Sequence, residues 1–440
     1  MRVSYQYRIK PNTEQKRRLN YIRRVCQYLY NYLLADRLNW WEQNRCAVNS
    51  CPLICYLPEL RDNPTYYSQK AYLPFLKEDL IKVDWSGELL DLSKIYSQVL
   101  QDVVKRVELA FKRYISGYKS GKRSGKPRFK SESTFKSFTY TQVLDNWLNG
   151  NYINLPKIGN VEIRRHRPLP NGLKVKTANV SKKADGWYVT LSLEDFSVPT
   201  FKPDEIVATE SNSIGLDAVL HENTFLATSE GEFIAARKVY RKNEEKLAKV
   251  SKKKSARKKG SKARRKLAKR EARVHQKIAR SRKDHHFNVA IDFCKSDKKV
   301  IFVEDLELKN LTKRNQAKQD ENGKYLPNNQ SAKSGLNKSF LDAGFGQFLG
   351  ILSYKVEKTG KKVVKVKPHY TSQICSCCDA YVEKTLSDRI HDCSECGIKL
   401  DRDINAAKNI KRVGLGLLLT IKRRKGKTNK STLKEIQELT

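Results

Sequence analysis

Alternation of polar and apolar residues opens the chain, and longer helical repeats follow it. The stretch VSYQYRIK (3–10) changes character at every second residue, which predicts a β-strand. Over residues 14–41, and again over 93–118, apolar and aromatic residues recur every three to four positions, so each stretch is a predicted helix. Basic residues occupy the other faces of both helices. The pattern therefore predicts a helical block over residues 11–120 behind one N-terminal strand.

Short strand patterns fill the next part of the chain. A stretch rich in Gly, Lys, Arg and Ser begins at residue 121 and marks the end of the helical block. Five strands are predicted after it, at 135–142, 152–155, 161–165, 173–180 and 187–193. A strand at residue 3 has no near neighbour in the sequence, so we expect it to pair with these later strands. The helical block would then be an insertion into a small β-barrel.

The pattern changes again near residue 204. Three short strands with tight turns predict an antiparallel meander, at 213–220, 224–228 and 233–237. Beyond the meander we expect a basic helical hairpin over 241–283, a buried strand at 300–306 and a polar mobile loop over 310–338. An amphipathic helix over 339–358, another strand at 363–366 and a solvated basic tail over 415–440 follow.

Charge narrows the class of partner. The 440 residues carry 88 Lys and Arg against 47 Asp and Glu, a formal charge of +41. Such a field attracts polyanions, so nucleic acid is the expected partner and an acidic substrate is disfavoured. The 21 Tyr, 15 Phe and 5 Trp exclude wholesale disorder. The apolar stretch at 413–421 is far shorter than the ~20 residues of a membrane span, and the first residues offer no signal-peptide core. We therefore expect a cytoplasmic protein with no membrane partner.

Positive charge is densest over residues 241–283. This segment holds 21 Lys and Arg and 3 Glu, a net charge of +18. We expect it to contact nucleic-acid phosphates, and the alternative is a solvated hairpin that touches nothing. The candidate contact residues are Lys252, Lys253, Lys254, Arg257, Lys258, Lys259, Arg128 and Lys130.

The cysteines suggest a metal site. Five of the ten lie within 22 residues, which favours metal ligation over a disulfide scaffold. Two CxxC pairs, 14 residues apart, are formed by Cys375, Cys378, Cys393 and Cys396. Four thiolates complete a tetrahedral zinc site, so the metal would be structural; the alternative is four unligated thiols. Cys377 could compete with Cys378, but its spacing from Cys375 is too tight for a zinc knuckle. Three N-terminal cysteines lack a fourth ligand nearby and are interpreted as buried thiols rather than a second metal site: Cys46, Cys51 and Cys55.

Acidic residues at the ends of predicted elements form a second candidate site. Asp217 lies within the apolar strand SIGLDAVL, Glu304 lies near the end of VIFVEDL, and a helix begins at Asp401 or Asp403. Each acid alone could be a cap or an edge salt bridge, but a carboxylate in a buried strand is costly without a compensating cation. Three carboxylates that converge at one end of a sheet can hold two Mg²⁺ ions about 3.5–4 Å apart, which suits phosphodiester hydrolysis.

Taken together, these motifs resemble the transposon-associated TnpB family, which is similar to the ancestors of the type V CRISPR nucleases. Zinc knuckles directly before DRDINAA are the most specific feature, and the likeness is dense from 200 to 412. The stretches that carry the resemblance are KPRFKS (126–131), SIGLDAVL (213–220), IFVEDLELKNL (301–311), residues 342–378 and CSECGIKLDRDINAAKNI (393–410).

The resemblance implies a multidomain α+β fold. A RuvC (ribonuclease-H-like) α/β nuclease domain would contain an inserted zinc ribbon, and an N-terminal wedge β-barrel would contain a helical recognition insertion. The barrel would comprise 1–10 and 121–203, the insertion 11–120, the nuclease domain 204–368 and 400–414, and the ribbon 369–399. By the same resemblance, the catalytic and Mg²⁺-binding acids are Asp217, Glu304 and Asp403, and the zinc ligands are the four cysteines of the two pairs.

The resemblance also implies an activity. It is RNA-guided cleavage of double-stranded DNA, with two Mg²⁺ ions at one active site and one structural Zn²⁺. The expected partners are a guide RNA and the target DNA, and we favour a monomer. The alternatives are an RNA-guided DNA-binding protein that does not cut, a miniature type V CRISPR effector with a CRISPR-derived guide, and a strand-transfer transposase. Nothing outside the three acids indicates the last of these.

Overall fold

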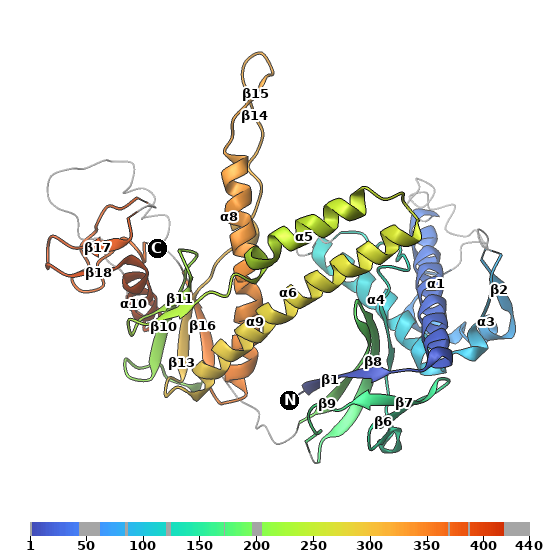
Figure 1. Cartoon of the computed structure of the whole chain (residues 1–440). Helices are drawn as coiled ribbons and strands as arrows, with labels where there is room; N and C mark the ends of the chain where they lie inside the picture. Colours follow the sequence, from blue (N-terminus) through green and yellow to red (C-terminus); the bar gives the residue numbers. More distant parts are fainter. Residues whose placement is uncertain are drawn as a thin grey trace, which may run out of the picture. The chain divides into compact units, whose positions relative to one another are not determined.

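The computed structural model describes residues 2–43, 62–83, 87–119, 125–170, 172–195, 205–367, 370–385 and 388–417. Cys46, Cys51 and Cys55, and nearly all of the predicted basic tail, lie outside these ranges. The chain divides into two compact units, Met1–Pro199 and Thr200–Thr440 (Figure 1). No helix within the described residues is long and apolar enough to cross a membrane.

An antiparallel sheet of seven strands forms the core of the first unit. Its order is β4-β8-β9-β1-β7-β6-β5. The N-terminal strand lies in the middle, where Tyr5 pairs with Leu191 and Ile9 pairs with Ile163, so the expected pairing with later strands is confirmed. The strands are β1 (Arg2–Lys10), β4 (Ser137–Tyr140), β5 (Leu148–Asn149), β6 (Tyr152–Leu155), β7 (Gly159–Arg164), β8 (Lys174–Lys183) and β9 (Gly186–Glu194).

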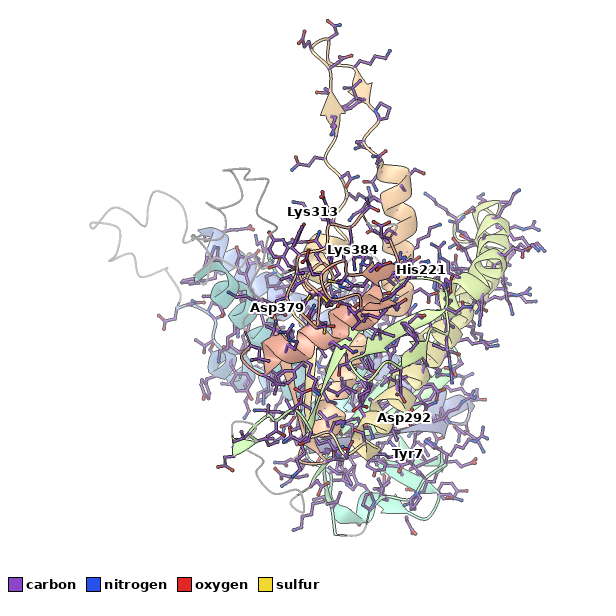
Figure 2. All side chains as sticks on the ribbon, turned by 90° about the vertical axis from the view of Figure 1, so that its left-hand side faces the viewer. Tyr7, His221, Asp292, Lys313, Asp379 and Lys384 are labelled. Atoms are coloured by element: carbon purple, nitrogen blue, oxygen red, sulfur yellow. The ribbon has the colours of Figure 1, made fainter. Side chains whose placement is uncertain are left out.

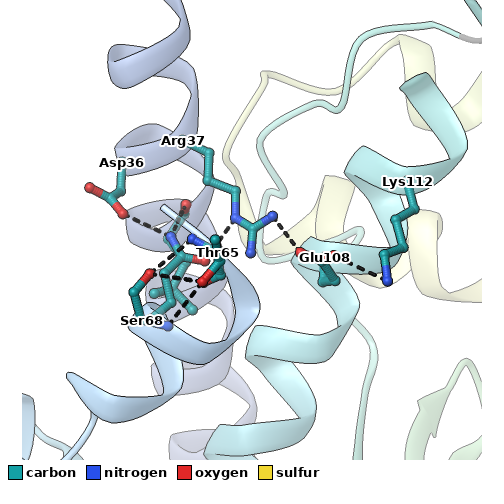
Figure 3. A network of polar contacts seen from close by, with 8 residues as sticks. Asp36, Arg37, Thr65, Ser68, Glu108 and Lys112 are labelled. Atoms are coloured by element: carbon teal, nitrogen blue, oxygen red, sulfur yellow. Dashed lines mark hydrogen bonds and ion pairs between the residues drawn. The ribbon is translucent and has the colours of Figure 1, made fainter. Parts of the chain in front are cut away.

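Helices pack against this sheet and against one another. Arg37, buried on α1, donates to Gln69 Oε1 at 2.9 Å and to Glu108 Oε2 at 2.6 Å, and so joins α1 to α2 and α4 (Figure 3). The predicted helical block also contains a hairpin in which Ile81 pairs with Leu90. The elements are α1 (Thr13–Gln43), α2 (Tyr66–Ala71), α3 (Phe75–Glu78), β2 (Leu80–Lys82), β3 (Leu89–Asp91) and α4 (Ser97–Lys119).

The second unit has a mixed five-stranded sheet in the order β12-β11-β10-β13-β16. The first three strands form the predicted antiparallel meander, and β10, β13 and β16 are parallel. They are β10 (Ser213–Ala218), β11 (Thr224–Thr228), β12 (Phe233–Ala235), β13 (Val300–Glu304) and β16 (Lys362–Val366). Burial on both faces explains why β10 and β13 are nearly continuous apolar runs in the sequence.

Helices cover both faces of this sheet (Figure 1). On β13, Ile301 and Val303 pack with α6 and α9, whereas Val300 and Phe302 pack with Ile410 of α10. Two further strands form a small hairpin between β16 and α10. The elements are α5 (Val239–Ser255), α6 (Lys262–Lys295), α9 (Phe345–Glu357), β17 (Ile390–Asp392), β18 (Lys399–Asp401) and α10 (Arg402–Gly414).

The segment between β13 and α9 differs from the expected polar loop. It contains α7 (Leu308–Leu311), a hairpin of β14 (Lys318–Gln319) and β15 (Tyr325–Leu326), and α8 (Gln330–Ala343). The prediction of one helix from residue 339 is wrong, because Gly344 adopts a left-handed conformation (φ 66°) and separates α8 from α9.

Candidate metal centres

Two acidic residues lie level with each other at the ends of neighbouring parallel strands. Asp217 is the penultimate residue of β10, and Glu304 is the last residue of β13. Leu216 pairs with Val303, so continuing the register by one residue brings Asp217 beside Glu304. Neighbours in register on adjacent strands face the same side of a sheet. Both side chains therefore point toward the face that α10 covers.

The third acid comes from the first turn of α10. Asp401 is the N-cap, and its carboxylate accepts hydrogen bonds from the backbone N–H groups of Asp403 and Ile404, at 2.7 and 3.4 Å. Asp403 instead lies close enough to Asp217 for its charge to raise the pKa of that carboxyl. His221, which follows β10 and is labelled in Figure 2, lowers the pKa of Asp403. Asp217 therefore lies within electrostatic reach of both Glu304 and Asp403, whereas Asp401 is the cap of α10.

Close packing at two glycines brings α10 against the sheet. A Cβ atom on Gly215 would lie 2.1 Å from the carbonyl oxygen of Ala407, and a Cβ on Gly414 would lie 2.2 Å from Cδ1 of Phe302. Neither contact is sterically possible, so only glycine permits this separation. A glycine within an apolar strand is the sequence signal for such an approach, and our sequence interpretation did not use it.

Burial raises the pKa of all three acids. For Asp217 the pKa lies well above its ordinary value, first because of burial and then because of the charges of Glu304 and Asp403. Burial also raises the pKa of Glu304 and of Asp403, with Asp401 adding to the latter. Arg389 opposes the shift at Asp403, with Nη1 4.0 Å from Oδ2. A divalent cation would relieve this repulsion, and carboxylate oxygens are the ligands that Mg²⁺ prefers.

The four cysteines of the two CxxC pairs gather at one point. Their Sγ atoms all lie within 4.8 Å of one another, with 3.7 Å between Cys375 and Cys396 and 3.5 Å between Cys378 and Cys393. Zn–S bonds of about 2.3 Å in a tetrahedron give S···S distances of about 3.8 Å. The donor set and its spacing therefore fit a zinc ion. Cys377 is exposed and lies outside the group.

Both cysteine pairs lie in turns of the same form. The N–H of Asp379 donates to the carbonyl of Cys375 at 3.1 Å, and the N–H of Gly397 donates to that of Cys393 at 2.8 Å. Asp379 and Gly397 are both left-handed, with φ of 63° and 70°. Cys378 therefore occupies in the first turn the position that Cys396 occupies in the second.

The basic candidates have different surroundings. Near the α5–α6 turn, Lys254 is half-buried and forms an ion pair with Glu271 of α6. Arg128 is exposed, whereas Lys130 has its backbone held by Gln27 and Asn31 of α1. The five other candidates, at the end of α5 and in the turn between α5 and α6, are exposed: Lys252, Lys253, Arg257, Lys258 and Lys259.

Comparisons with known proteins connect these features. Three family models match successive parts of the chain: "Helix-turn-helix domain" over 1–46, "Probable transposase" over 197–315, and "Cas12f1-like, TNB domain" over 345–410. The second match contains Asp217 and Glu304, and the third contains the four cysteines and Asp403. Within 2–43, the first match corresponds to β1 and a single long helix.

Full-length relatives extend the likeness. "Putative RNA-guided DNA endonuclease InsQ" of Escherichia coli (strain K12) is 28% identical over 420 residues, which cover 94% of this chain and 93% of the relative. "Putative RNA-guided DNA endonuclease" of Streptomyces pristinaespiralis is 27% identical over 443 residues, which cover 98% and 95%. A solved structure described as that of the mini-RNA-guided endonuclease CRISPR-Cas_phi3 shares the fold, with a TM-score of 0.50, 10% identity and coverage of 96% and 94%. From its first strand to its last helix, the chain resembles the transposon-associated TnpB family.

Proposed function

We propose that this chain is a transposon-associated RNA-guided endonuclease that cuts double-stranded DNA at a single RuvC-type centre. The observation that carries the proposal is the convergence of three carboxylates from β10, β13 and α10, in which the charges of the half-buried Glu304 and Asp403 both act on the buried Asp217. The order of the five-stranded sheet, with three antiparallel strands followed by two parallel ones, supports a ribonuclease-H-like domain. In this proposal the first unit is a wedge with a helical recognition insertion between β1 and β4.

The chemistry would be metal-assisted hydrolysis. Asp217, Glu304 and Asp403 would hold two Mg²⁺ ions, which supply an activated water and stabilise the leaving oxygen of the phosphodiester. The carboxylates of β10 and β13 are fixed by the sheet, and that of α10 by the packing at Gly215 and Gly414. No side chain has to act as a nucleophile. With one such centre, both DNA strands would have to reach it in turn.

Other parts of the chain would supply recognition and structure. A guide RNA would select the target by base pairing, while basic residues contact the phosphate backbone and a short flanking motif. Cys375, Cys378, Cys393 and Cys396 would hold one structural zinc ion in a ribbon inserted between β16 and α10. We propose domain ranges of 204–368 and 400–414 for the nuclease domain and 369–399 for the ribbon.

The proposal can be tested with the purified protein and the RNA that copurifies with it. Sequencing that RNA gives the guide, and a DNA library that joins the matching target to random flanks then serves as substrate. We expect Mg²⁺-dependent cutting by the wild type, and guide-dependent binding without cutting by Glu304→Gln. Binding without cutting by the wild type would contradict cleavage and support a repressor-like protein. A guide derived from a CRISPR array would replace the transposon association with a type V effector.

A further inference from the structure

A turn over residues 370–376 lies between the four-cysteine cluster and the three acids. The backbone N–H groups of Gln373 and Ile374 both donate to the carbonyl of Tyr370 at 3.0 Å, and Cys375 follows directly. At the other side of this turn, the hydroxyl of the buried Thr371 donates to Oε1 of Glu304 at 3.1 Å. One short segment thus contacts the carboxylate centre and carries the first cysteine of the cluster.

Two fully buried asparagines of α10 hold the 370–376 turn. Asn409 Nδ2 donates to the carbonyls of Thr371 and Ile374, at 2.8 and 2.7 Å. Asn405 Nδ2 donates to the carbonyl of Ile374 at 2.8 Å and to that of Thr371 at 3.4 Å. Asn405 Oδ1 also accepts from the N–H of Ser376 at 2.9 Å. These asparagines lie two and six residues after Asp403 on the same helix.

The chemistry of this contact suits amides. Each of the two carbonyls accepts two hydrogen bonds, which uses both of its lone pairs, and the N–H groups of the two side-chain amides supply them. Aspartate at 405 or 409 would place a carboxylate against carbonyl oxygens, and leucine would leave buried acceptors short of donors. The pair is therefore a specific clamp between α10 and the 370–376 turn.

We propose that Thr371 is a positioning residue of the nuclease centre, held in place by the Asn405–Asn409 clamp. Its hydroxyl fixes the orientation of the Glu304 carboxylate, while the clamp fixes the turn relative to the helix that carries Asp403. The segment that begins the cysteine cluster thus orients Glu304 directly and is bonded to the helix that carries Asp403. This inference rests on the proposed function and adds residues that sequence interpretation did not single out.

Substitution of Thr371 tests the role of its hydroxyl in cleavage. Thr371→Val keeps the shape but removes the donor, so we expect cleavage at limiting Mg²⁺ to fall by about tenfold or more, as for other groups that orient metal ligands. The Mg²⁺ concentration for half-maximal rate should rise, and Thr371→Ser should restore most of the wild-type behaviour. Thr359→Val is the matched control: Thr359 lies in the turn after α9, and within the described residues its hydroxyl bonds to the carbonyl of Val356, far from Glu304 in the sequence. Equal loss in the Val and Ser variants, or wild-type cutting by Thr371→Val at every Mg²⁺ concentration, would overturn the proposal.

Hydrogen exchange tests the clamp without measuring activity. In Asn409→Leu, amide exchange within 370–376 should accelerate by about tenfold or more, because the turn loses buried hydrogen bonds. Asn243→Leu on α5, where Nδ2 bonds to the carbonyl of Val239, is the control and should leave that exchange unchanged. Unchanged exchange in Asn409→Leu would overturn the clamp. If the wild type fails to cut any guide-matched DNA, the proposed function fails, and the exchange result still decides whether the clamp exists.

Discussion

At the start of α10, two aspartates only two residues apart have different tasks. The carboxylate of Asp401 accepts from two backbone N–H groups of the first turn, which satisfies donors that a helix N-terminus otherwise leaves unpaired. Asp403 follows the cap, and its charge acts on Asp217. The sequence DRD leaves open which acid begins the helix, and only the backbone geometry separates the cap from the member of the acid group.

Substitution with asparagine separates the two roles. Asp403→Asn should abolish cleavage, because an amide is a poor replacement for an anionic metal ligand. Asp401→Asn should retain most of the activity, since Asn caps a helix about as well as Asp. Guide-dependent DNA binding should stay near the wild-type level in both variants, because phosphate contacts dominate the affinity. Cleavage rates on one matched duplex check this, and full-rate cutting by Asp403→Asn with loss in Asp401→Asn would reverse the assignment.

At the scale of elements, the separation between α10 and the sheet sets where the third acid lies. Gly215→Ala would force the helix away from β10, so we expect a loss of about 1–3 kcal/mol in unfolding free energy. Cleavage should fall by about 100-fold, the typical effect of a 1 Å displacement of reacting groups. Thermal unfolding and cleavage rates measure the two effects. Gly350→Ala is the control, because its Cβ would meet open space on α9, and it should be neutral or stabilising. Normal cutting by Gly215→Ala would show that this contact does not position Asp403.

The two cysteine turns make a separate prediction at this scale. We expect one zinc ion per chain, retained in Cys377→Ser and lost in Cys378→Ser, because Cys377 lies outside the group of four thiols. Loss of zinc should also impair cleavage, since the turn that holds Cys375 is bonded to α10. Metal analysis of the purified variants measures the zinc content. The reverse result, with zinc lost from Cys377→Ser and kept in Cys378→Ser, would contradict the ligand assignment.

Elements that bury an apolar stripe could be predicted from the sequence, and elements held by polar contacts could not. The apolar runs of β10 and β13 indicated buried strands, and the doubled CxxC spacing indicated the cysteine cluster. In α8 only Asp342 is buried, so no apolar period marks the helix. Its carboxylate accepts from the N–H groups of Tyr240 and Arg241 at the start of α5 and pairs with Arg282 of α6. Periodicity does not detect such contacts, and the same is true of the hydrogen bonds of Thr371.

At the scale of the whole molecule, the net charge of +41 favours binding to nucleic acid in general. The net charge does not say which surface binds, so the binding surface has to be found from local contacts. The turn between α5 and α6 presents five exposed basic side chains close together in sequence, at residues 252, 253 and 257–259. Lys254, beside them, is paired with Glu271 and is expected to contribute less. If these side chains contact phosphates, binding releases counterions from the nucleic acid, and the salt dependence of the affinity reflects those contacts. If they only add to the net charge, removing the same charge elsewhere on the protein should have the same effect on the affinity.

Neutralising the five exposed residues to glutamine should weaken RNA binding and reduce its dependence on salt. Each lost phosphate contact should lower the slope of log affinity against log salt by roughly 0.7–0.9. The control is a variant with the same change of charge at five exposed residues between β13 and α8: Lys309, Lys313, Arg314, Lys318 and Lys324. Binding titrations of the two variants over a range of salt concentrations separate local contact from net charge. An equal fall in slope for both variants would mean that the α5–α6 hairpin contributes only its charge. An unchanged slope for the variant at residues 252, 253 and 257–259 would mean that these side chains are a solvated face.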